Sequence, residues 1–333
     1  MRISAVPEPL QLTIHPSQFP DEEAAALAAS LADGRVDPRL HYQTPLQSQR
    51  WLKVFERWSP FMNREDCRAI YRKSSRQVAA ESTGDVAVIA LGCGDGSKDL
   101  ELLNGLRDGG ARIHFVPLDV SASLSTRAAL SARDLVASDR IHPIVADLAR
   151  ARDLGTWLDA RLPVTAGRIF TFYGMIPNFE PQEVFPVLSG LLRPGDRLLF
   201  SANLVAGDDF NAAVERILPQ YDNPETRTWL MTLLEEVGTA DGAGELRFGV
   251  EPGSYSAELR RVVARFRFTK DSRLRILDQT FRYSKGADLR LFFSYRYSGE
   301  QIQKLFTRFE IRSLDSWITD HGEEGVFLCA ADA

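Results

Sequence analysis

The sequence predicts an α/β fold in which a mainly parallel, seven-stranded sheet is covered by helices on both faces. Apolar, strand-like runs alternate with polar, helix-like segments, and that alternation is typical of parallel sheets. A helix opened by the capping box of Ser298 and Gln301 precedes two more strand-like runs near the C-terminus. The predicted strands cover 86–91, 112–119, 141–147, 168–174, 196–203, 309–317 and 324–331.

Two regions lie outside this pattern. The N-terminal region predicts an Ala-rich helix over 21–34, stopped by glycine, and helical structure over 48–80. Residues 209–297 predict helices, a Gly-rich loop and then two hairpins over 262–277 and 280–297, where alternating apolar residues flank turn residues. We therefore expect an α+β insertion between the fifth and sixth strands, which caps the sheet together with the N-terminal helices.

Composition narrows the functional classes. The chain has 333 residues, 44% of them hydrophobic, and a formal net charge of −5. This charge disfavours nucleic acid or an anionic membrane as partner, and the first residues lack the apolar block of a signal peptide, so we expect a cytoplasmic protein. Three scattered cysteines and five scattered histidines show no metal-ligand spacing, so we expect no metal site.

The stretch VAVIALGCGDGSKDLELL (86–103) predicts a ligand-binding turn between a strand and a helix beginning near Ser97. Gly92, Gly94 and Gly96 let a ligand approach the backbone closely, at the sheet edge where open α/β folds bind ligands. Their GxGxG spacing differs from the GxGxxG fingerprint of nicotinamide dinucleotide sites. It resembles motif I of class I S-adenosylmethionine (SAM) methyltransferases. By that resemblance Asp119 binds the ribose hydroxyls, and Asp147 with Leu148 binds the adenine.

Further motifs resemble the histidine Nα-methyltransferases of ergothioneine biosynthesis, in the order found in that family. They include LGCGDGSKDLELL, VPLDVSASL, GMIPNFEPQEV, QYDNPETRTWL and FFSYRYSGEQI. The resemblance implies a Rossmann-like core that binds SAM and a substrate domain. It divides the chain into an N-terminal helical part of the substrate domain (1–64), the SAM-binding core (65–208), the substrate-domain insertion (209–297) and the C-terminal part of the core (298–333).

Site residues follow from the resemblance position by position. The implied substrate-binding residues are Tyr42, Asn178, Tyr221, Phe292 and Ser294, and Asn178 and Tyr221 are also implied to act in catalysis by holding the carboxylate and amino end of the substrate. The implied cofactor-binding residues are Gly92, Gly94, Gly96, Lys98, Asp119, Val120, Asp147, Leu148, Tyr173 and Gly174.

Two departures from the family pattern bear on the substrate. Phe292 occupies the position of the glutamate that binds imidazole in the family, and PFMNR (60–64) replaces the EYYPTR element, so a pocket tyrosine is missing. A buried imidazole N–H without an acceptor is unfavourable. We therefore predict methyl transfer to the amine of a small, amino-acid-like substrate other than histidine, with a more apolar or aromatic side chain.

Other interpretations remain open at this stage. The glycine turn could pack within a non-nucleotide protein, the scaffold could methylate N or O of another small metabolite, or the chain could bind SAM without catalysis. Asn178 could cap the helix beginning near Pro181, and Cys93 could be a filler rather than a nucleophile. The arginines of 260–275 could form a nucleic-acid surface, although a solvated strand face fits the net negative charge better.

Overall fold

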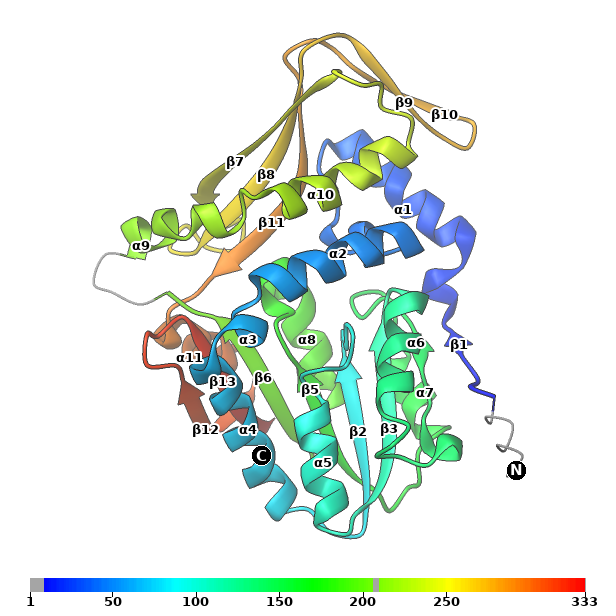
Figure 1. Ribbon diagram of the computed structural model, residues 1–333, viewed down its shortest axis with the longest axis vertical. Coiled ribbons are helices and arrows are strands. Elements are labelled where there is room, and N and C mark those ends of the chain that lie inside the picture. Colours follow the sequence, from blue (N-terminus) through cyan, green and yellow to red (C-terminus); the bar gives the residue numbers. More distant parts are fainter. Residues whose placement is uncertain (1–8, 206–209, 333) are drawn as a thin grey trace, which may run out of the picture.

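The computed structural model describes residues 9–205 and 210–332, and its main layer is an eight-stranded sheet (Figure 1). The strand order is β1-β4-β3-β2-β5-β6-β13-β12; the strands from β1 to β6 are parallel to their neighbours, whereas β13 is antiparallel to both β6 and β12. Seven of these strands correspond to the predicted ones, and the two-residue β1 adds an eighth at the edge. The bounds are β1 Thr13–Ile14, β2 Asp85–Leu91, β3 Arg112–Asp119, β4 Ile144–Val145, β5 Gly167–Phe172, β6 Arg197–Asn203, β12 Ile311–Ile318 and β13 Glu324–Ala331.

Helices cover both faces of this sheet, as the alternating pattern predicts. Alternate residues of β2 enter two separate cores: Val88 packs with α4 and α5, whereas Ile89 packs on the face covered by α7, α8 and α11. Both side chains are fully buried. The helices of this layer are α4 Glu65–Ala80, α5 Leu100–Asp108, α6 Ala122–Ser131, α7 Leu154–Asp159, α8 Pro181–Leu191 and α11 Gly299–Arg308, with 3₁₀ turns η1 Pro16–Gln18, η3 Ser138–Arg140 and η4 Ile176–Asn178.

A second layer, here called the roof, lies across the carboxyl ends of the parallel strands and consists of residues 20–58 and 210–297 (Figure 1). It has its own core, in which Leu31, Trp229 and Phe266 from different elements are buried together. Its strands form a three-stranded antiparallel sheet, β11-β8-β7, and a separate β9–β10 hairpin. The elements are α1 Pro20–Asp33, η2 Pro38–His41, α2 Pro45–Trp58, α9 Phe210–Arg216, η5 Leu218–Gln220, α10 Pro224–Glu236, β7 Gly244–Pro252, β8 Arg260–Phe268, β9 Ser272–Ile276, β10 Gln279–Tyr283 and β11 Asp288–Arg296, and the short α3 Pro60–Asn63 follows α2.

The predicted pairing of the roof strands is wrong. β8 does not form a hairpin with β9; it lies between β7 and β11, and β9 pairs with β10 instead. The nine-residue β8 and β11 place Phe266 opposite Leu289, and both side chains are buried in the roof core. Because this long pairing buries more apolar surface than a short local hairpin, β9 and β10 are left to form an excursion between them. The second half of the segment predicted as a Gly-rich loop (238–249) belongs to β7.

A β-bulge in β11 determines which of its side chains face the centre of the molecule. Arg290 is opposite Arg265, but Phe292 is opposite the next residue of β8, Ala264, so Leu291 is the extra residue. After the bulge, Ser294 and Arg296 are on the same face as Phe292. These three side chains line a cavity between the roof and the main sheet.

No helix in the described part of the chain is both long and apolar enough to cross a membrane.

Candidate active site

The glycine turn after β2 forms the floor of this cavity. Gly92 and Gly94 line it and have φ values of 70° and 55°, which favour glycine. A Cβ on Gly92 would lie 2.3 Å from Sδ of Met175, and one on Gly94 would lie 3.0 Å from the Trp51 ring. Gly96 does not line the cavity; a Cβ there would lie 2.9 Å from Cβ of Ala128 on α6. The turn continues to Leu100, so α5 begins three residues later than Ser97.

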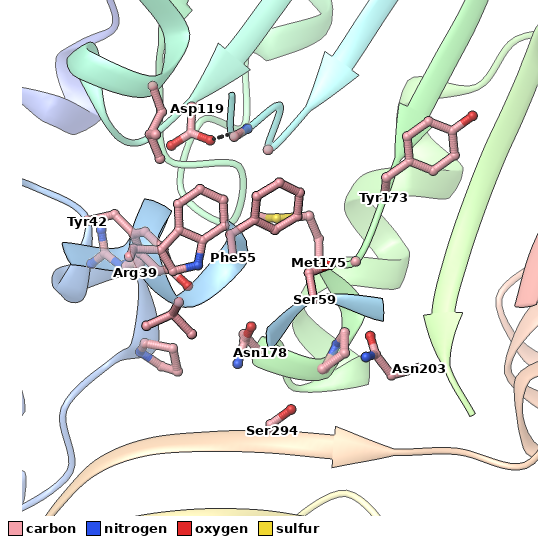
Figure 2. Close-up of a pocket in the computed structure, with 18 of the residues that line it drawn as sticks. Arg39, Tyr42, Phe55, Ser59, Asp119, Tyr173, Met175, Asn178, Asn203 and Ser294 are labelled. Atoms are coloured by element: carbon pink, nitrogen blue, oxygen red, sulfur yellow. Dashed lines mark hydrogen bonds between the residues drawn. The ribbon is translucent and has the colours of Figure 1, made fainter. Parts of the chain in front are cut away.

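Asp119, at the end of β3, faces the cavity beside this turn (Figure 2). Its Oδ2 accepts a hydrogen bond from the Gly94 N–H at 3.0 Å, and its Oδ1 accepts one from the Ser121 N–H at 2.9 Å. Burial raises the pKa of Asp119 to about 6, although these backbone hydrogen bonds oppose the shift. Each carboxylate oxygen can accept further hydrogen bonds, so the group can also bind ligand hydroxyls.

Asp147 lies after β4 and is 1% exposed. Arg39 of η2 approaches it, with Nη1 2.6 Å from Oδ2, so the roof contacts the main sheet through an ion pair. Burial raises the pKa of Asp147, and the Arg39 charge opposes this rise. Leu148 and Val120 line the same end of the cavity.

A cluster of polar side chains lies at the end of the glycine turn that is farther from Asp147. Lys98 Nζ donates to the Tyr71 hydroxyl at 3.0 Å, and that hydroxyl donates to Oε1 of Glu324 at 2.5 Å. The Gly174 N–H donates to Ser201 Oγ, which also lies 2.8 Å from the Tyr71 hydroxyl. Burial raises the pKa of Glu324, whereas Lys98, the hydrogen bond from Tyr71 and Arg296 lower it. Lys98, Tyr173, Gly174 and Glu324 line the cavity.

Asn178 and Ser294 approach the cavity from the side opposite Asp119 (Figure 2). The Asn178 side chain donates from Nδ2 to the Phe293 carbonyl of β11 at 2.7 Å. It does not cap α8, whose N-cap is Glu180. Tyr221 and Ser294 share a hydrogen bond of 2.8 Å between their hydroxyls. The Phe293 carbonyl can accept only from the side-chain nitrogen of Asn178, so the side-chain oxygen of Asn178 takes no part in this contact.

An aromatic wall completes the cavity, formed by Tyr42, Trp51, Trp229 and Phe292. The ring of Tyr42 lies 5.7 Å from that of Trp51 and 5.3 Å from that of Trp229, and Phe292 meets Trp229 edge to face at 5.7 Å. Burial raises the pKa of Tyr42 above its usual range. These rings come from α2, α10, β11 and, for Tyr42, the residue after η2, and they make this end of the cavity apolar.

The cavity has a volume of about 290 Å³ and brings together fourteen of the fifteen predicted site residues, leaving out Gly96. Sequence reasoning missed several lining residues, among them Arg39, Met175 and Arg296. Arg296 had a usable signal, since it follows Ser294 by two residues in a strand. The Cys93 thiol also lines the cavity, but burial raises its pKa well above the usual range, which disfavours a nucleophilic thiolate.

The fold and the cavity suit a nucleoside cofactor. The backbone cradle at Gly92 and Gly94 has no room for side chains, and carboxylates end the next two strands of the sheet. This arrangement at the carboxyl edge of a parallel sheet defines the class of Rossmann-like, nucleoside-binding proteins, and the GxGxG spacing of the turn resembles that of SAM-dependent methyltransferases within this class.

Comparisons with known proteins identify the family. A family model described as "Histidine-specific methyltransferase, SAM-dependent" matches residues 52–331, and the chain therefore belongs to this family of SAM-dependent enzymes. It is similar to the histidine N-alpha-methyltransferase of Mycobacterium tuberculosis (strain CDC 1551 / Oshkosh), with 25% identity over 277 residues, covering 78% of this chain and 80% of that protein.

Solved methyltransferase structures are more distant. The 1,6-didemethyltoxoflavin-N1-methyltransferase of Burkholderia thailandensis has a TM-score of 0.42 and 12% identity, covering 98% of this chain and 94% of its own. Magnesium protoporphyrin IX methyltransferase from Synechocystis PCC 6803 has a TM-score of 0.40 and 14% identity, covering 86% and 94%.

Proposed function

We propose that this enzyme transfers the methyl group of SAM to the amine of an amino-acid-like small molecule other than histidine. The observation that carries this proposal is the place of Phe292. It is 5% exposed and packs its ring against Trp229 and Tyr221, beside Ser294. The carboxylates lining the cavity among the described residues are Asp37, Asp95, Asp119, Asp147 and Glu324, and none of them is on β11.

The presence of Phe292 instead of the glutamate found in the family disfavours the binding of histidine. An imidazole N–H buried against the Phe292 ring would lack an acceptor, at a cost of about 1–3 kcal/mol. That cost corresponds to roughly one to two orders of magnitude in substrate preference. An aromatic or aliphatic side chain would instead gain contact with the aromatic wall. Phe61, which lines the cavity from the PFMNR segment, adds another ring without a hydroxyl.

We assign the cofactor to the glycine-turn side of the cavity. Asp119 would accept from the ribose hydroxyls, and Asp147 from the adenine amine, with Val120 and Leu148 packing on the base. Lys98, Tyr173 and Gly174 lie at the other end of the turn and suit the methionine part, where the ammonium of Lys98 can pair with a carboxylate. The position of Gly96 against Ala128 supports a packing role for that residue.

Asn178 would orient the acceptor amine. Its Nδ2 is held by the Phe293 carbonyl, so its Oδ1 can accept from an amine N–H and direct the nitrogen lone pair. SAM supplies an electrophilic methyl group, and the enzyme must present a deprotonated amine in line with it. Tyr221, held by Ser294, would contact the carboxylate end of the acceptor.

The two layers suggest a division of labour. We propose that the roof acts as the substrate domain, built from the N-terminal segment (1–64) and the insertion (209–297). The remaining segments, 65–208 and 298–333, would form the core that binds SAM. Residues 206–208 of that core, residue 209 of the insertion and residues 1–8 lie outside the described residues.

A substrate panel tests the proposal. The purified enzyme is incubated with SAM and, separately, L-phenylalanine, L-tyrosine, L-tryptophan, L-leucine and L-histidine, and products are followed by mass spectrometry. We expect methylated products from aromatic or aliphatic amino acids and at least about tenfold slower turnover of histidine. Preference for histidine would contradict the proposal. The variant Phe292→Leu keeps the site apolar, so its turnover of histidine should stay as slow as that of the wild type.

A further inference from the structure

One arginine that lines the cavity forms no ion pair with the described residues. Five arginines are buried among the described residues: Arg39, Arg168, Arg261, Arg290 and Arg296. Each of the first four has a carboxylate oxygen within 4 Å. Arg296 has none within that distance among the described residues, although it is only 6% exposed.

One nitrogen of the Arg296 guanidinium also has no hydrogen-bond partner in the described part of the chain. Its Nε is buried without a partner among the described residues. Its guanidinium lies over the Tyr221 ring, with Cζ 5.2 Å from the ring centre, and lines the cavity. A cation–π contact compensates only part of the cost of removing a guanidinium from water. The arrangement therefore leaves a cation ready to pair with an anion in the cavity.

Glu324 has an electrostatic interaction with Arg296 but lies beyond ion-pair distance of it. Its Oε1 accepts from Tyr71, and Lys98 has the stronger influence on its pKa. Among the described residues, this end of the cavity is lined by the two cations Lys98 and Arg296 and the carboxylate Glu324. The ammonium of Lys98 is placed toward Gly174, where a Cβ would lie 3.1 Å from Nζ, so it belongs to the cofactor side. Arg296 is on β11, with the acceptor-side residues Phe292 and Ser294.

We propose that Arg296 binds a carboxylate of the methyl acceptor. The inference rests on the proposed function and sharpens it: the acceptor is an amino acid with a free carboxylate, not the corresponding decarboxylated amine. The planar guanidinium can offer two parallel N–H groups to a carboxylate, a geometry that a lysine ammonium cannot provide. Its stacking on Tyr221 orients this pair beside the hydroxyl of the same tyrosine.

The test compares acids with amines. The enzyme is loaded with S-adenosylhomocysteine (SAH), and isothermal titration measures the affinity for each acid and for the corresponding amine. The pairs are L-phenylalanine with phenethylamine and L-tryptophan with tryptamine. The proteins compared are the wild type, Arg296→Gln and Arg296→Lys. Arg296→Gln should weaken binding of the acids on the order of 10- to 100-fold and leave the amines unchanged. Arg296→Lys should bind the acids more tightly than Arg296→Gln does, but less tightly than the wild type does. The matched control is Arg260→Gln. Arg260 is the β8 residue opposite Arg296 in the strand register, but it does not line the cavity.

SAH titration of each variant separates the possible results. Retained SAH affinity shows that Arg296→Gln is folded, whereas an equal loss for SAH and the acids would assign Arg296 to the cofactor and overturn the inference. Unchanged binding of the acids by Arg296→Gln would overturn it while leaving the amino-acid proposal intact. Tighter binding of the amines than of the acids by the wild type, or no binding of any acid, would overturn both.

Discussion

At the scale of single residues, the burial of Asp119 bears on its proposed role in binding the cofactor. It accepts backbone hydrogen bonds from Gly94 and Ser121, so its carboxylate is fixed relative to the glycine turn. The same burial raises its pKa to about 6. A residue with this role must be ionised to accept from two ribose hydroxyls, so cofactor affinity becomes sensitive to mildly acidic pH.

We expect the affinity for SAH to fall as the pH decreases through about 6. Below this value Asp119 is protonated before the ligand binds, and one of its oxygens becomes a donor. The loss should approach roughly tenfold per pH unit, as expected for one proton. Isothermal titration between pH 8 and pH 5 measures it. Asp119→Asn should bind SAH more weakly at pH 8 and lose most of this pH dependence; a wild-type affinity constant to pH 5 would contradict the assignment.

The sequence predicted most of the residues that line both sides of the cavity, but it did not predict all of their partners. Asp119 and Asp147 follow predicted strands, and strand ends of a parallel sheet meet at one edge. The partner of Asp147 could not be found in this way, because Arg39 is more than a hundred residues away and its contact depends on how the roof docks.

At the scale of elements, the glycine turn combines two tasks that its sequence does not separate. Gly92 and Gly94 border the cavity, whereas Gly96 lies against α6. All three have positive φ. A single motif therefore contains residues that open a binding site and a residue that permits helix packing.

Substitution of Gly96 should reveal its packing role as lost stability. Gly96→Ala adds a Cβ 2.9 Å from Cβ and 3.0 Å from Cα of Ala128, on top of the strain at φ +80°. We expect the free energy of unfolding to fall by about 1–3 kcal/mol more than for Gly110→Ala, whose φ is +78° with nothing within 4 Å. Urea denaturation without ligand compares the two variants. Equal losses would show that backbone strain alone accounts for the effect.

Prediction at this scale succeeded where local pattern and final pairing agree. The third strand of the sheet covers residues 112–119 as predicted, because its apolar run has a parallel partner on either side. The predicted pairing of the roof strands was wrong, because the alternation of apolar residues predicts where strands are but does not identify their partners. Leu277, with φ +49°, is in the observed β9–β10 turn and gives no usual turn signal.

At the scale of the whole molecule, the roof and the main sheet meet around the cavity. Arg39 reaches Asp147, Asn178 of η4 donates to β11, and Ser48 of α2 shares a hydrogen bond of 2.7 Å with Ser121. These contacts come from segments widely separated in sequence. Arg39, Asp147 and Asn178, which line the cavity, therefore also hold the two layers together.

Removing the Arg39 charge should destabilise the enzyme in a pH-dependent manner. In Arg39→Gln, Asp147 remains buried with only the more exposed Arg150, 3.5 Å away, as a cationic partner, which costs up to about 3 kcal/mol while Asp147 is ionised. Loss of Arg39 raises the Asp147 pKa further, so the folded state takes up a proton more readily than the unfolded state, and the loss shrinks as pH falls. Urea denaturation at pH 8 and pH 5.5 measures this. The control Arg35→Gln, at an exposed ion pair, should change little at either pH; a larger loss at pH 5.5 would contradict this role.

The bulge at Leu291 sets the parity of β11. If Leu291 were instead paired with Ala264 in a continuous ladder, Phe293 and Tyr295 would face the cavity, and Phe292, Ser294 and Arg296 would face away from it. Deletion of Phe292 with the bulge kept would place Phe293 opposite Ala264, and so bring Phe293 and Tyr295 to the cavity in place of Ser294 and Arg296 with no substitution in the sequence. Acceptor choice in such a scaffold can change by insertion or deletion as readily as by replacement of side chains.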